Sequence, residues 1–293
     1  MIFKFVSRLF VFAQYVIPKH AISRFTGALS RLRLSWMTHL AIYVFVKAYD
    51  VDMAEAAEPD IRNYSSFNAF FTRALAPGVR PLAVERAEIV SPTDGIVSQI
   101  GMIDGSCIIQ AKGIDYTLVD LFDGDDDLAS RFDNGGFVTI YLAPRNYHRV
   151  HLPLAGRARF LRYLPGTLFS VDDATTRKIR RLFCRNERVA VVYDTRGGNF
   201  ALIMVGALNV GSIELTLPVP KHFANRPHAN YPPQETHELD ADPAACGSEF
   251  GRFNMGSTVI LMTSRGLVEW SATLAAGTRL KMGEPLGRLL SPG

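Results

Sequence analysis

The three residues Gly256, Ser257 and Thr258 are the first place in the chain where residue types and order could do chemistry. The apolar run Val259–Met262 follows directly and predicts a buried strand. A hydroxyl placed where the backbone enters a core needs a hydrogen-bond partner or a chemical role. Because Gly256 has no Cβ, the Ser257 hydroxyl can approach its carbonyl, and the backbone can hold an unusual conformation. The alternative is an ordinary Gly-Ser turn that enters a strand.

Two histidines, His148 and His151, form a second candidate group. An H-x-x-H pair can ligate a metal, but no third ligand follows at a convincing spacing and no C-x-x-C pair is present, so we expect no metal site. Either imidazole could instead be structural, with its ring nitrogens bonded to backbone. Histidine is also the natural base for activating a serine hydroxyl, because its ordinary pKa lies near neutrality.

Asp94 is the third candidate. It precedes Gly95 between two β-type runs, and Asp-Gly is a common turn, so the segment taken alone predicts a turn. A carboxylate is also the group that commonly orients a histidine base toward a serine nucleophile. The aspartate, the histidines and the serine together therefore carry more weight than any one of them alone.

The elements that must position these residues belong to a chain of ordinary globular composition. Its 293 residues predict one large or two modest domains with a sizeable core. The formal net charge is +4, and the three cysteines are far apart. This cysteine usage predicts a reducing compartment and no disulfide framework.

The first 49 residues carry seven lysines and arginines and no acid, and Asp50 is the first carboxylate. Apolar and aromatic residues separate these cations. Pro18 is expected to end or bend a first helix, and residues 34–46 form a second apolar stretch. Neither stretch reaches the roughly 18 uninterrupted apolar residues of a spanning helix. The mixture suits helices lying in the interface of an anionic bilayer.

Two other interpretations of the N-terminal region remain open. A cleaved signal peptide fits the cations and the apolar run, but no small-x-small cleavage site is evident. An ordinary amphipathic helix packed on the body would also explain the pattern.

The rest of the chain predicts an α+β fold. Short helices are expected at residues 52–57 and 66–73, where Phe67, Phe70 and Phe71 have the spacing of a core-facing helix. After a Pro/Gly-rich linker the pattern changes to short β-runs with glycine turns, interrupted by helices at 116–122 and 174–183 and by a long loop at 221–247. We therefore expect an N-terminal helical, membrane-associating region (residues 1–75) and a mostly β catalytic domain with flanking helices (residues 82–293).

Three motifs together resemble those of the phosphatidylserine decarboxylases. The sequence GRFNMGST at 251–258 is similar to the family's processing site GRFxLGST, with Met255 in place of leucine, a swap that keeps volume and apolarity. SPTDGIV at 91–97 is close to PADGxV, and YLAPRNYHRVHLP at 141–153 is nearly identical to YLSPRDYHRVHxP. Further similarity covers residues 110–113, 164–171, 185–188 and 205–214 and the N-terminal helices, so the resemblance spans nearly the whole chain.

This resemblance implies a self-processing enzyme. The chain would be cut between Gly256 and Ser257, and Ser257 would become a covalent pyruvoyl group, the only cofactor. The products, residues 1–256 and 257–293, would stay together as a heterodimer. Asp94, His151 and Ser257 would form the relay for self-cleavage, and His148 would serve the mature enzyme.

The reaction implied by the resemblance is the conversion of phosphatidylserine to phosphatidylethanolamine and CO₂, through a Schiff base between the pyruvoyl ketone and the substrate amine. The partners would be phosphatidylserine and an anionic membrane surface, with no nucleic acid. The expected location is the cytoplasmic face of the cell membrane, as a peripheral protein.

Two competing functions remain to be weighed. A Ser-His-Asp hydrolase acting on lipid or peptide would keep Ser257 as a hydroxyl and leave the chain intact, but no G-x-S-x-G elbow surrounds this serine. A catalytically silent membrane-associated β-module makes no demand on Asp94, His148, His151 and Ser257 together.

Overall fold

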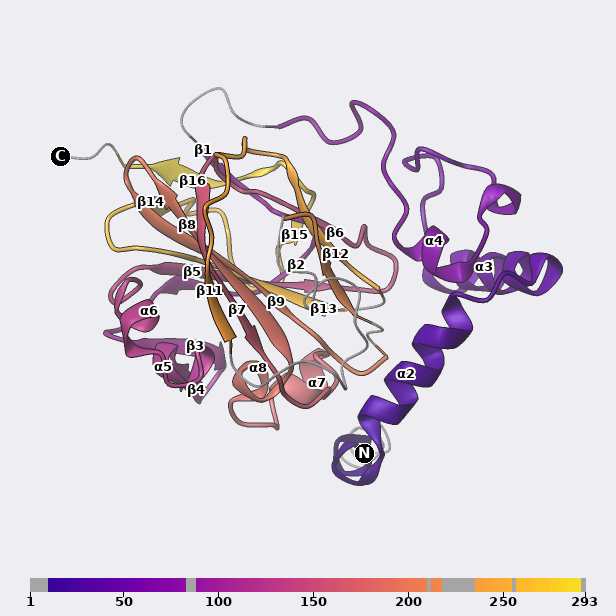
Figure 1. Ribbon diagram of the computed structural model, residues 1–293, viewed down its shortest axis with the longest axis horizontal. Helices are drawn as coiled ribbons and strands as arrows, with labels where there is room; N and C mark the ends of the chain where they lie inside the picture. Colours follow the sequence, from indigo (N-terminus) through magenta and orange to yellow (C-terminus); the bar gives the residue numbers. More distant parts are fainter. Residues whose placement is uncertain (1–9, 83–87, 210–211, 218–234, 255–256, 291–293) are drawn as a thin grey trace.

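The computed structural model describes residues 10–82, 88–209, 212–217, 235–254 and 257–290. Figure 1 shows a β-rich body with the N-terminal helices to one side of it. The body contains one large antiparallel sheet, two three-stranded sheets and a hairpin. This arrangement confirms the α+β class with a mostly β body and N-terminal helices.

The large sheet has eight strands, and every neighbouring pair in it is antiparallel. In spatial order they are β11 (Glu235–Glu238), β7 (Arg157–Leu164), β8 (Arg188–Thr195), β9 (Gly198–Val205), β13 (Ser257–Thr263), β5 (Gly136–Leu142), β2 (Gly95–Met102) and β15 (Arg279–Leu280).

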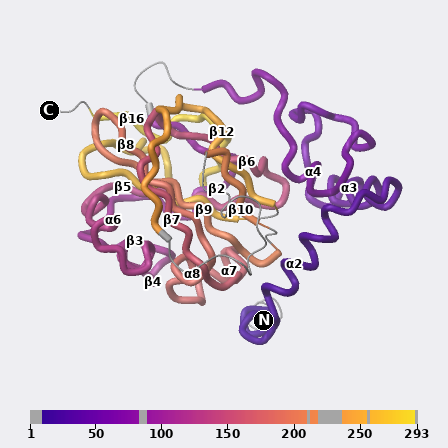
Figure 2. Tube along the Cα trace, viewed as in Figure 1, coloured from indigo at the N-terminus to yellow at the C-terminus, as the bar shows by residue number. Residues whose placement is uncertain are grey.

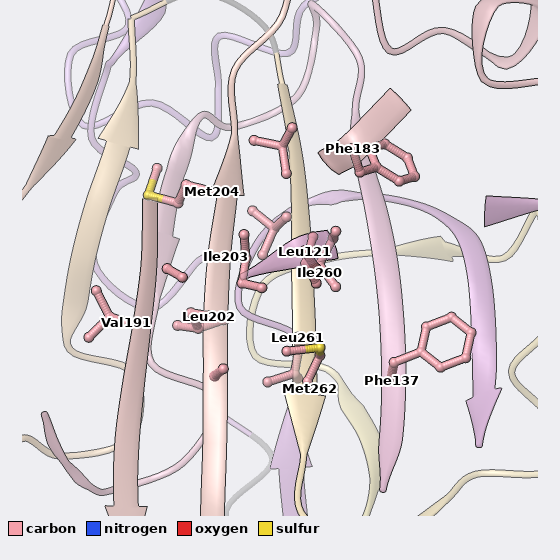
Figure 3. Packing of buried hydrophobic residues seen from close by; sticks show 14 of the residues in the cluster. Leu121, Phe137, Phe183, Val191, Leu202, Ile203, Met204, Ile260, Leu261 and Met262 are labelled. Atoms are coloured by element: carbon pink, nitrogen blue, oxygen red, sulfur yellow. The ribbon is translucent and has the colours of Figure 1, made fainter. Parts of the chain in front are cut away.

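Strand β13 lies near the middle of this sheet, between β5 and β9, and all seven of its residues are buried. Figure 3 shows Ile260, Leu261 and Met262 packed among side chains of the neighbouring strands, Leu202 and Phe137 among them. A strand covered on both faces needs a continuous apolar run rather than an alternating one. The buried strand predicted from residues 259–262 is therefore confirmed.

Smaller elements close the body around the large sheet. One three-stranded sheet contains β1 (Glu88–Val90), β16 (Pro285–Leu289) and β14 (Val268–Trp270), and the other contains β10 (Ile213–Leu215), β12 (Glu249–Phe253) and β6 (Arg149–His151). The hairpin joins β3 (Cys107–Ala111) to β4 (Ile114–Thr117). The body's helices are α5 (Leu118–Leu121), α6 (Asp126–Ser130), α7 (Asp173–Thr176) and α8 (Leu182–Arg185).

The N-terminal region contains helical residues 10–16, α2 (Lys19–Ser30), α3 (Ser35–Tyr49), a 3₁₀ turn η1 (Ile61–Asn63) and α4 (Phe67–Phe71). The break at Pro18 agrees with the sequence prediction. Phe70 and Phe71 are buried in a separate small core with Ile42, which confirms the core-facing pattern predicted for this helix. The Ser66 hydroxyl caps α4 by accepting a hydrogen bond from the Ala69 N–H (3.1 Å).

The N-terminal helices leave much of their apolar surface exposed. Trp36 is 72 % exposed, Phe25 69 % and Phe12 68 %, whereas Ile42 is fully buried. Among the described residues, no helix combines the length and apolarity needed to cross a membrane.

The prediction of a helix at residues 52–57 is wrong. Their backbone pairs with residues 74–76 instead: Ala57 N–H donates to Ala74 O, and Ala76 N–H donates to Glu55 O, each at 2.9 Å. This pairing uses the backbone groups that a helix would need. A contact between segments nearly twenty residues apart has no local sequence signal.

Three other predicted elements need correction. Residues 116–122 divide into the end of β4 and α5, because the Thr117 side chain caps a helix that starts at Leu118. Residues 174–183 form α7 and the start of α8 rather than one helix. The buried Gln110 side chain bonds Thr176 O, Ile179 O and Leu182 N and so satisfies the backbone between them. Part of the predicted 221–247 loop is strand β11, and residues 221–234 lie outside the described residues.

Candidate active site

Ser257 is the first residue of β13 and pairs with Leu142 at the end of β5. Its side chain is buried, and its Oγ has no hydrogen-bond partner among the described residues. Leaving a hydroxyl buried and unpaired costs free energy. Thr258 and Thr263 of the same strand share this condition, so the unpaired state of Ser257 gains its meaning from the GRFNMGST motif around it. Met255 and Gly256, and with them the predicted scissile bond, lie outside the described residues.

Asn254, three residues before Ser257, is held from two sides. Its Nδ2 donates to Ser212 Oγ (2.7 Å) and its N–H donates to Ser212 O (3.0 Å). Its Oδ1 accepts from Asn68 Nδ2 of α4 (3.0 Å). The N-terminal helices therefore contribute directly to holding the segment that leads to Ser257. Asn254 was not predicted as a site residue, because its position beside the GST motif was the only sequence signal for it.

His148 is completely buried, with its ring 4.0 Å from the ring of Phe71. Its Nδ1 is 2.8 Å from Asn146 O, and since a carbonyl only accepts, Nδ1 carries the proton. Its Nε2 is buried without a hydrogen-bond partner among the described residues. Burial, and then the charge of Arg73, lower the pKa of His148 to about 3, so the imidazole is neutral. The site thus contains an unbonded basic nitrogen as well as an unbonded hydroxyl.

His151 has both ring nitrogens bonded. Nδ1 donates to Gly247 O (2.9 Å), and Nε2 accepts from the hydroxyl of Tyr147 (2.9 Å). Burial lowers the pKa of His151 and raises that of Tyr147, so a neutral imidazole accepts a hydrogen bond from a neutral phenol. Tyr147 was not predicted as a site residue, although it directly precedes His148 in the sequence.

Asp94 is buried and bound by Arg80. Arg80 donates from Nε to Oδ1 (3.0 Å) and from Nη2 to Oδ2 (2.7 Å), and the Met282 N–H donates to Oδ1 (2.8 Å). Arg80 also donates to Glu55 of the N-terminal region (2.6 Å). This bidentate geometry is the strong form of the Arg–carboxylate pair. Nothing in the local sequence indicated Arg80 as the partner of Asp94.

The structure brings the predicted motifs side by side. His151 N–H donates to Pro92 O (2.7 Å), which places strand β6 against the segment containing Asp94. The negative charge of Asp94 acts to raise the pKa of His151, against the larger effect of burial. Strand β6 also pairs with β12, the strand that leads to Ser257. No hydrogen bond joins any two of the described residues Asp94, His151 and Ser257. The Asp-His-Ser relay therefore stays a prediction.

A cleft of about 390 Å³ opens between the N-terminal region and the body beside Asp94, and Ser257, His148 and His151 are not among the residues that line it. Asp94 and Tyr147 line it from the body, and Glu55, Arg73 and Arg80 line it from the other side. The cleft is rich in both acids and bases, as expected for the binding of a polar, charged group.

The residues at Ser257 fit a group made from the chain itself. Ser257 is a buried serine with an unpaired oxygen at a strand start, and a glycine precedes it in the sequence, which is compatible with conversion of this serine to a pyruvoyl group. No group of three or more His, Cys, Asp or Glu side chains suited to a metal occurs within the described ranges.

Comparison with known proteins places this chain in a family. A family model described as phosphatidylserine decarboxylase matches residues 67–288, and a second model, described as PSD, matches residues 9–50. The chain is 44 % identical over 281 residues to the phosphatidylserine decarboxylase proenzyme of Saccharophagus degradans, covering 96 % of this chain and 97 % of that protein. The proenzymes of Pseudomonas fluorescens and Alcanivorax borkumensis are each 43 % identical, and the matches cover 96 % of this chain and 97 % and 96 % of theirs.

A β-rich body with a buried serine at the start of a central strand thus coincides with near full-length similarity to one class of decarboxylase. The chain belongs to the phosphatidylserine decarboxylase family and is an enzyme of the lyase class.

Proposed function

We propose that this enzyme cuts itself between Gly256 and Ser257 and then converts phosphatidylserine to phosphatidylethanolamine and CO₂ at a membrane surface. The observation that carries the proposal is the buried, unpaired Ser257 Oγ at the start of β13, within GRFNMGST. A hydrolytic serine needs an oxygen that a substrate can reach, whereas a serine that reacts with its own backbone can be buried. The burial of Ser257 therefore supports self-processing as the first reaction of this serine, and the pyruvoyl group formed from it must become accessible to the lipid amine once the 256–257 bond is cut.

In self-cleavage, Ser257 Oγ attacks the Gly256 carbonyl and turns the peptide bond into an ester. Loss of the Ser257 α-proton then expels the ester oxygen by β-elimination, which leaves a Gly256 carboxylate on the longer chain and a dehydroalanine on the shorter one. The dehydroalanine tautomerises to an imine, and water hydrolyses this imine to the pyruvoyl ketone with release of ammonia. We assign the base to His151, oriented by Asp94. In this assignment the His151 Nε2 exchanges its bond to Tyr147 for one to Ser257, and the two hydrogen bonds from Arg80 fix the position of the Asp94 carboxylate.

In turnover, the pyruvoyl group supplies the electron sink for the bond between the substrate's amine-bearing carbon and its carboxylate. His148 is assigned to this stage, near the carboxylate and the carbon that receives a proton. Its pKa of about 3 keeps the imidazole uncharged, so it does not stabilise the carboxylate of the bound substrate by ion pairing. A dry, uncharged surrounding favours loss of CO₂, because the negative charge spreads as the bond breaks.

The two products are expected to stay together as a heterodimer. Strand β13 of the shorter chain pairs with β5 and β9 of the longer one, and β16 pairs with β1. The buried apolar side chains of β13 hold these strands together without the 256–257 bond.

We propose a peripheral location at the cytoplasmic face of the cell membrane. The exposed aromatic side chains of residues 10–16, α2 and α3 lie among lysines and arginines, a combination suited to the interface of an anionic bilayer. Contact there would give the enzyme access to a substrate that resides in the lipid.

Release of CO₂ from carboxyl-labelled phosphatidylserine in detergent micelles tests the activity. Wild-type enzyme should release label, and Ser257→Ala should release none and remain uncut, since alanine has no nucleophile. Ser264→Ala is a matched control, because Ser264 lies past the other end of β13. A Ser257→Ala protein that still released CO₂ would refute the pyruvoyl mechanism.

A further inference from the structure

Two cations share one aromatic ring where the N-terminal helices meet the body. Lys19 Nζ lies 4.5 Å from the centre of the Phe169 ring, and the Arg185 guanidinium carbon lies 4.9 Å from the same centre. Arg185 is also 5.7 Å from the centre of the Tyr15 ring. Within the described part of the chain, Lys19 donates to Gln14 O and neither cation forms an ion pair with a carboxylate.

Like charges this close repel each other, and burial together with Arg185 lowers the pKa of Lys19. An aromatic face attracts each cation by only about 0.5–1 kcal/mol at an exposed site and supplies no countercharge. The arrangement therefore lacks an anion that could bridge the two side chains.

A hollow of about 520 Å³ adjoins one of these two cations, Arg185. Arg180, Arg181 and Arg185 line it together with a single acid, Asp115. Asp120 pairs with Arg181 (2.9 Å), whereas no ion pair to Arg180 occurs among the described residues. The surroundings of Arg185 are thus dominated by arginine, the side chain best suited to phosphate oxygens.

The cation pair also lies beside exposed apolar side chains. Phe12, Tyr15 and Val16, on the helical residues 10–16, are 68 %, 53 % and 73 % exposed. Gln14 of the same turn anchors them to the body by bonding Thr175 Oγ1 (3.2 Å) and Ser170 N (2.8 Å). Figure 2 shows α7 and α8 on the side of the body that faces the N-terminal end of the chain.

This region lies at the Ser257 end of the large sheet. Two residues after Arg185, Glu187 O accepts from Gly206 N–H (2.8 Å), and the preceding Val205 pairs with Thr258. A ligand bound by Lys19 and Arg185 would therefore lie on the same side of the body as the start of β13.

We propose that Lys19 and Arg185 bind the phosphate of an anionic phospholipid in the bilayer, while Phe12, Tyr15 and Val16 enter the interface beside it. The body thereby makes its own lipid contact, in addition to that of α2 and α3, and the contact orients the Ser257 end of the sheet toward the membrane. This inference rests on the proposed action at a membrane surface.

The test measures binding of the full-length enzyme to phosphatidylcholine vesicles with and without about one third phosphatidylglycerol, an anionic lipid that is not the substrate. Replacing both cations (Lys19→Gln with Arg185→Gln) should weaken binding to the anionic vesicles about 5-fold for each charge removed, roughly 25-fold in all. Binding to the neutral vesicles should change little. The charge-retaining pair Lys19→Arg with Arg185→Lys should keep most of the affinity.

The matched control removes two charges elsewhere, by Arg265→Gln with Arg288→Gln. Both arginines are exposed, and they lie after the far end of β13 and on β16. This variant should bind anionic vesicles within about 2-fold of wild type if the site rather than net charge matters.

Wild-type affinity in the Lys19→Gln/Arg185→Gln variant, or an equal loss in the Arg265/Arg288 control, would overturn the inference. Should the double variant not fold, the single variants Lys19→Gln and Arg185→Gln give the same decision at about 5-fold each. Release of CO₂ by the wild-type enzyme in micelles tests the proposed function separately, so the two failures are distinguishable.

Discussion

Strand β13 and helix α3 are both rich in apolar residues, but the structure uses them in opposite ways. All seven residues of β13 are buried, whereas only Thr38 and Ile42 of the fifteen residues of α3 are buried. Trp36, Leu40 and Tyr43 of α3 are each more than half exposed. Apolar composition is therefore common to a core and to a surface that awaits a partner, and only the neighbours of a segment separate the two.

The body and the N-terminal helices therefore differ in their expected tasks. The body holds the chemical groups dry and fixed, and the N-terminal helices present apolar and cationic side chains outward. The regions meet at Asn68 and Asn254 and at Arg31, which donates to Ser212 Oγ (3.2 Å). Exposed side chains of the helices should therefore affect lipid binding alone, while residues at these junctions should affect both.

The largest effects should come from the two site histidines of the body, the buried His148 and the half-buried His151. His151→Ala and Asp94→Asn should accumulate uncut chain, because the base for Ser257 is lost or misoriented. His148→Ala should still be cut but should lose at least about 100-fold in CO₂ release, the usual size of a general acid–base contribution. A denaturing gel beside a CO₂ assay measures both.

The control for the histidine variants is His39→Ala, on α3, which should be cut and active. Uncut His148→Ala together with normal maturation of His151→Ala would reverse the two roles. The unbonded Nε2 of His148 makes that reversal a real outcome of the experiment.

The second test compares equivalent truncations in the two regions. Ile260→Ala in β13 should lower the free energy of unfolding by about 2–5 kcal/mol, since the surrounding strands cannot collapse into the space. Leu40→Ala in α3, where the side chain is 55 % exposed, should change it by about 0.5 kcal/mol or less. If denaturant unfolding showed the same loss of free energy of unfolding in both variants, the exposed face of α3 would be packed rather than open.

The third test concerns lipid binding by the N-terminal helices. Arg33→Glu should weaken binding to anionic vesicles by about 1–2 kcal/mol, with the loss reduced at high salt. Trp36→Ala should weaken binding with little dependence on salt. Arg31→Glu is a poorer probe than Arg33→Glu, since Arg31 donates a hydrogen bond to Ser212 Oγ of the body. Deletion of residues 1–48 should abolish most of the binding, and unchanged binding of that truncation would make the helices structural only.

The smallest effect is a pH dependence of the body. A buried histidine with a pKa lowered to about 3 stays neutral when folded, whereas in the unfolded chain it takes up a proton below about pH 6.5. The contribution of His148 to the free energy of unfolding is therefore complete above pH 6.5 and falls by about 1.4 kcal/mol between pH 7.5 and 5.5. His151, with its pKa also lowered, acts in the same direction. Denaturant unfolding of wild type and His148→Gln measures the slope, which should be smaller in the variant.

Local patterns predicted much of the fold. The apolar run at 259–262 gave β13, and the helical spacing of Phe67, Phe70 and Phe71 gave α4. Strands β7 and β12 were among those missed, because a register shift interrupts the alternation in each, between Ala158 and Phe160 and between Glu249 and Gly251. The single helix predicted at 174–183 is divided into α7 and α8, because the side chain of the distant Gln110 bonds the backbone between them.

The candidate site was predicted in its chemical groups but not in its contacts. Asp94, His148, His151 and Ser257 lie in recognisable motifs, whereas Arg80 and Asn68 lie 14 and 186 residues from the groups they bind. Such partners are chosen by tertiary packing, which a single sequence does not display. The hydrogen-bond partners of His151 were not predicted either. Gly247 is 96 residues away in the sequence, and the bond to Tyr147, four residues away, depends on how the backbone turns between the two residues.

The mass of the purified wild-type protein under denaturing conditions tests the central claim most directly. Self-processing predicts two chains, residues 1–256 and residues 257–293, with the shorter one beginning in a pyruvoyl group that reacts with a carbonyl reagent. A full-length chain that retains the Ser257 hydroxyl while releasing CO₂ from phosphatidylserine would contradict it.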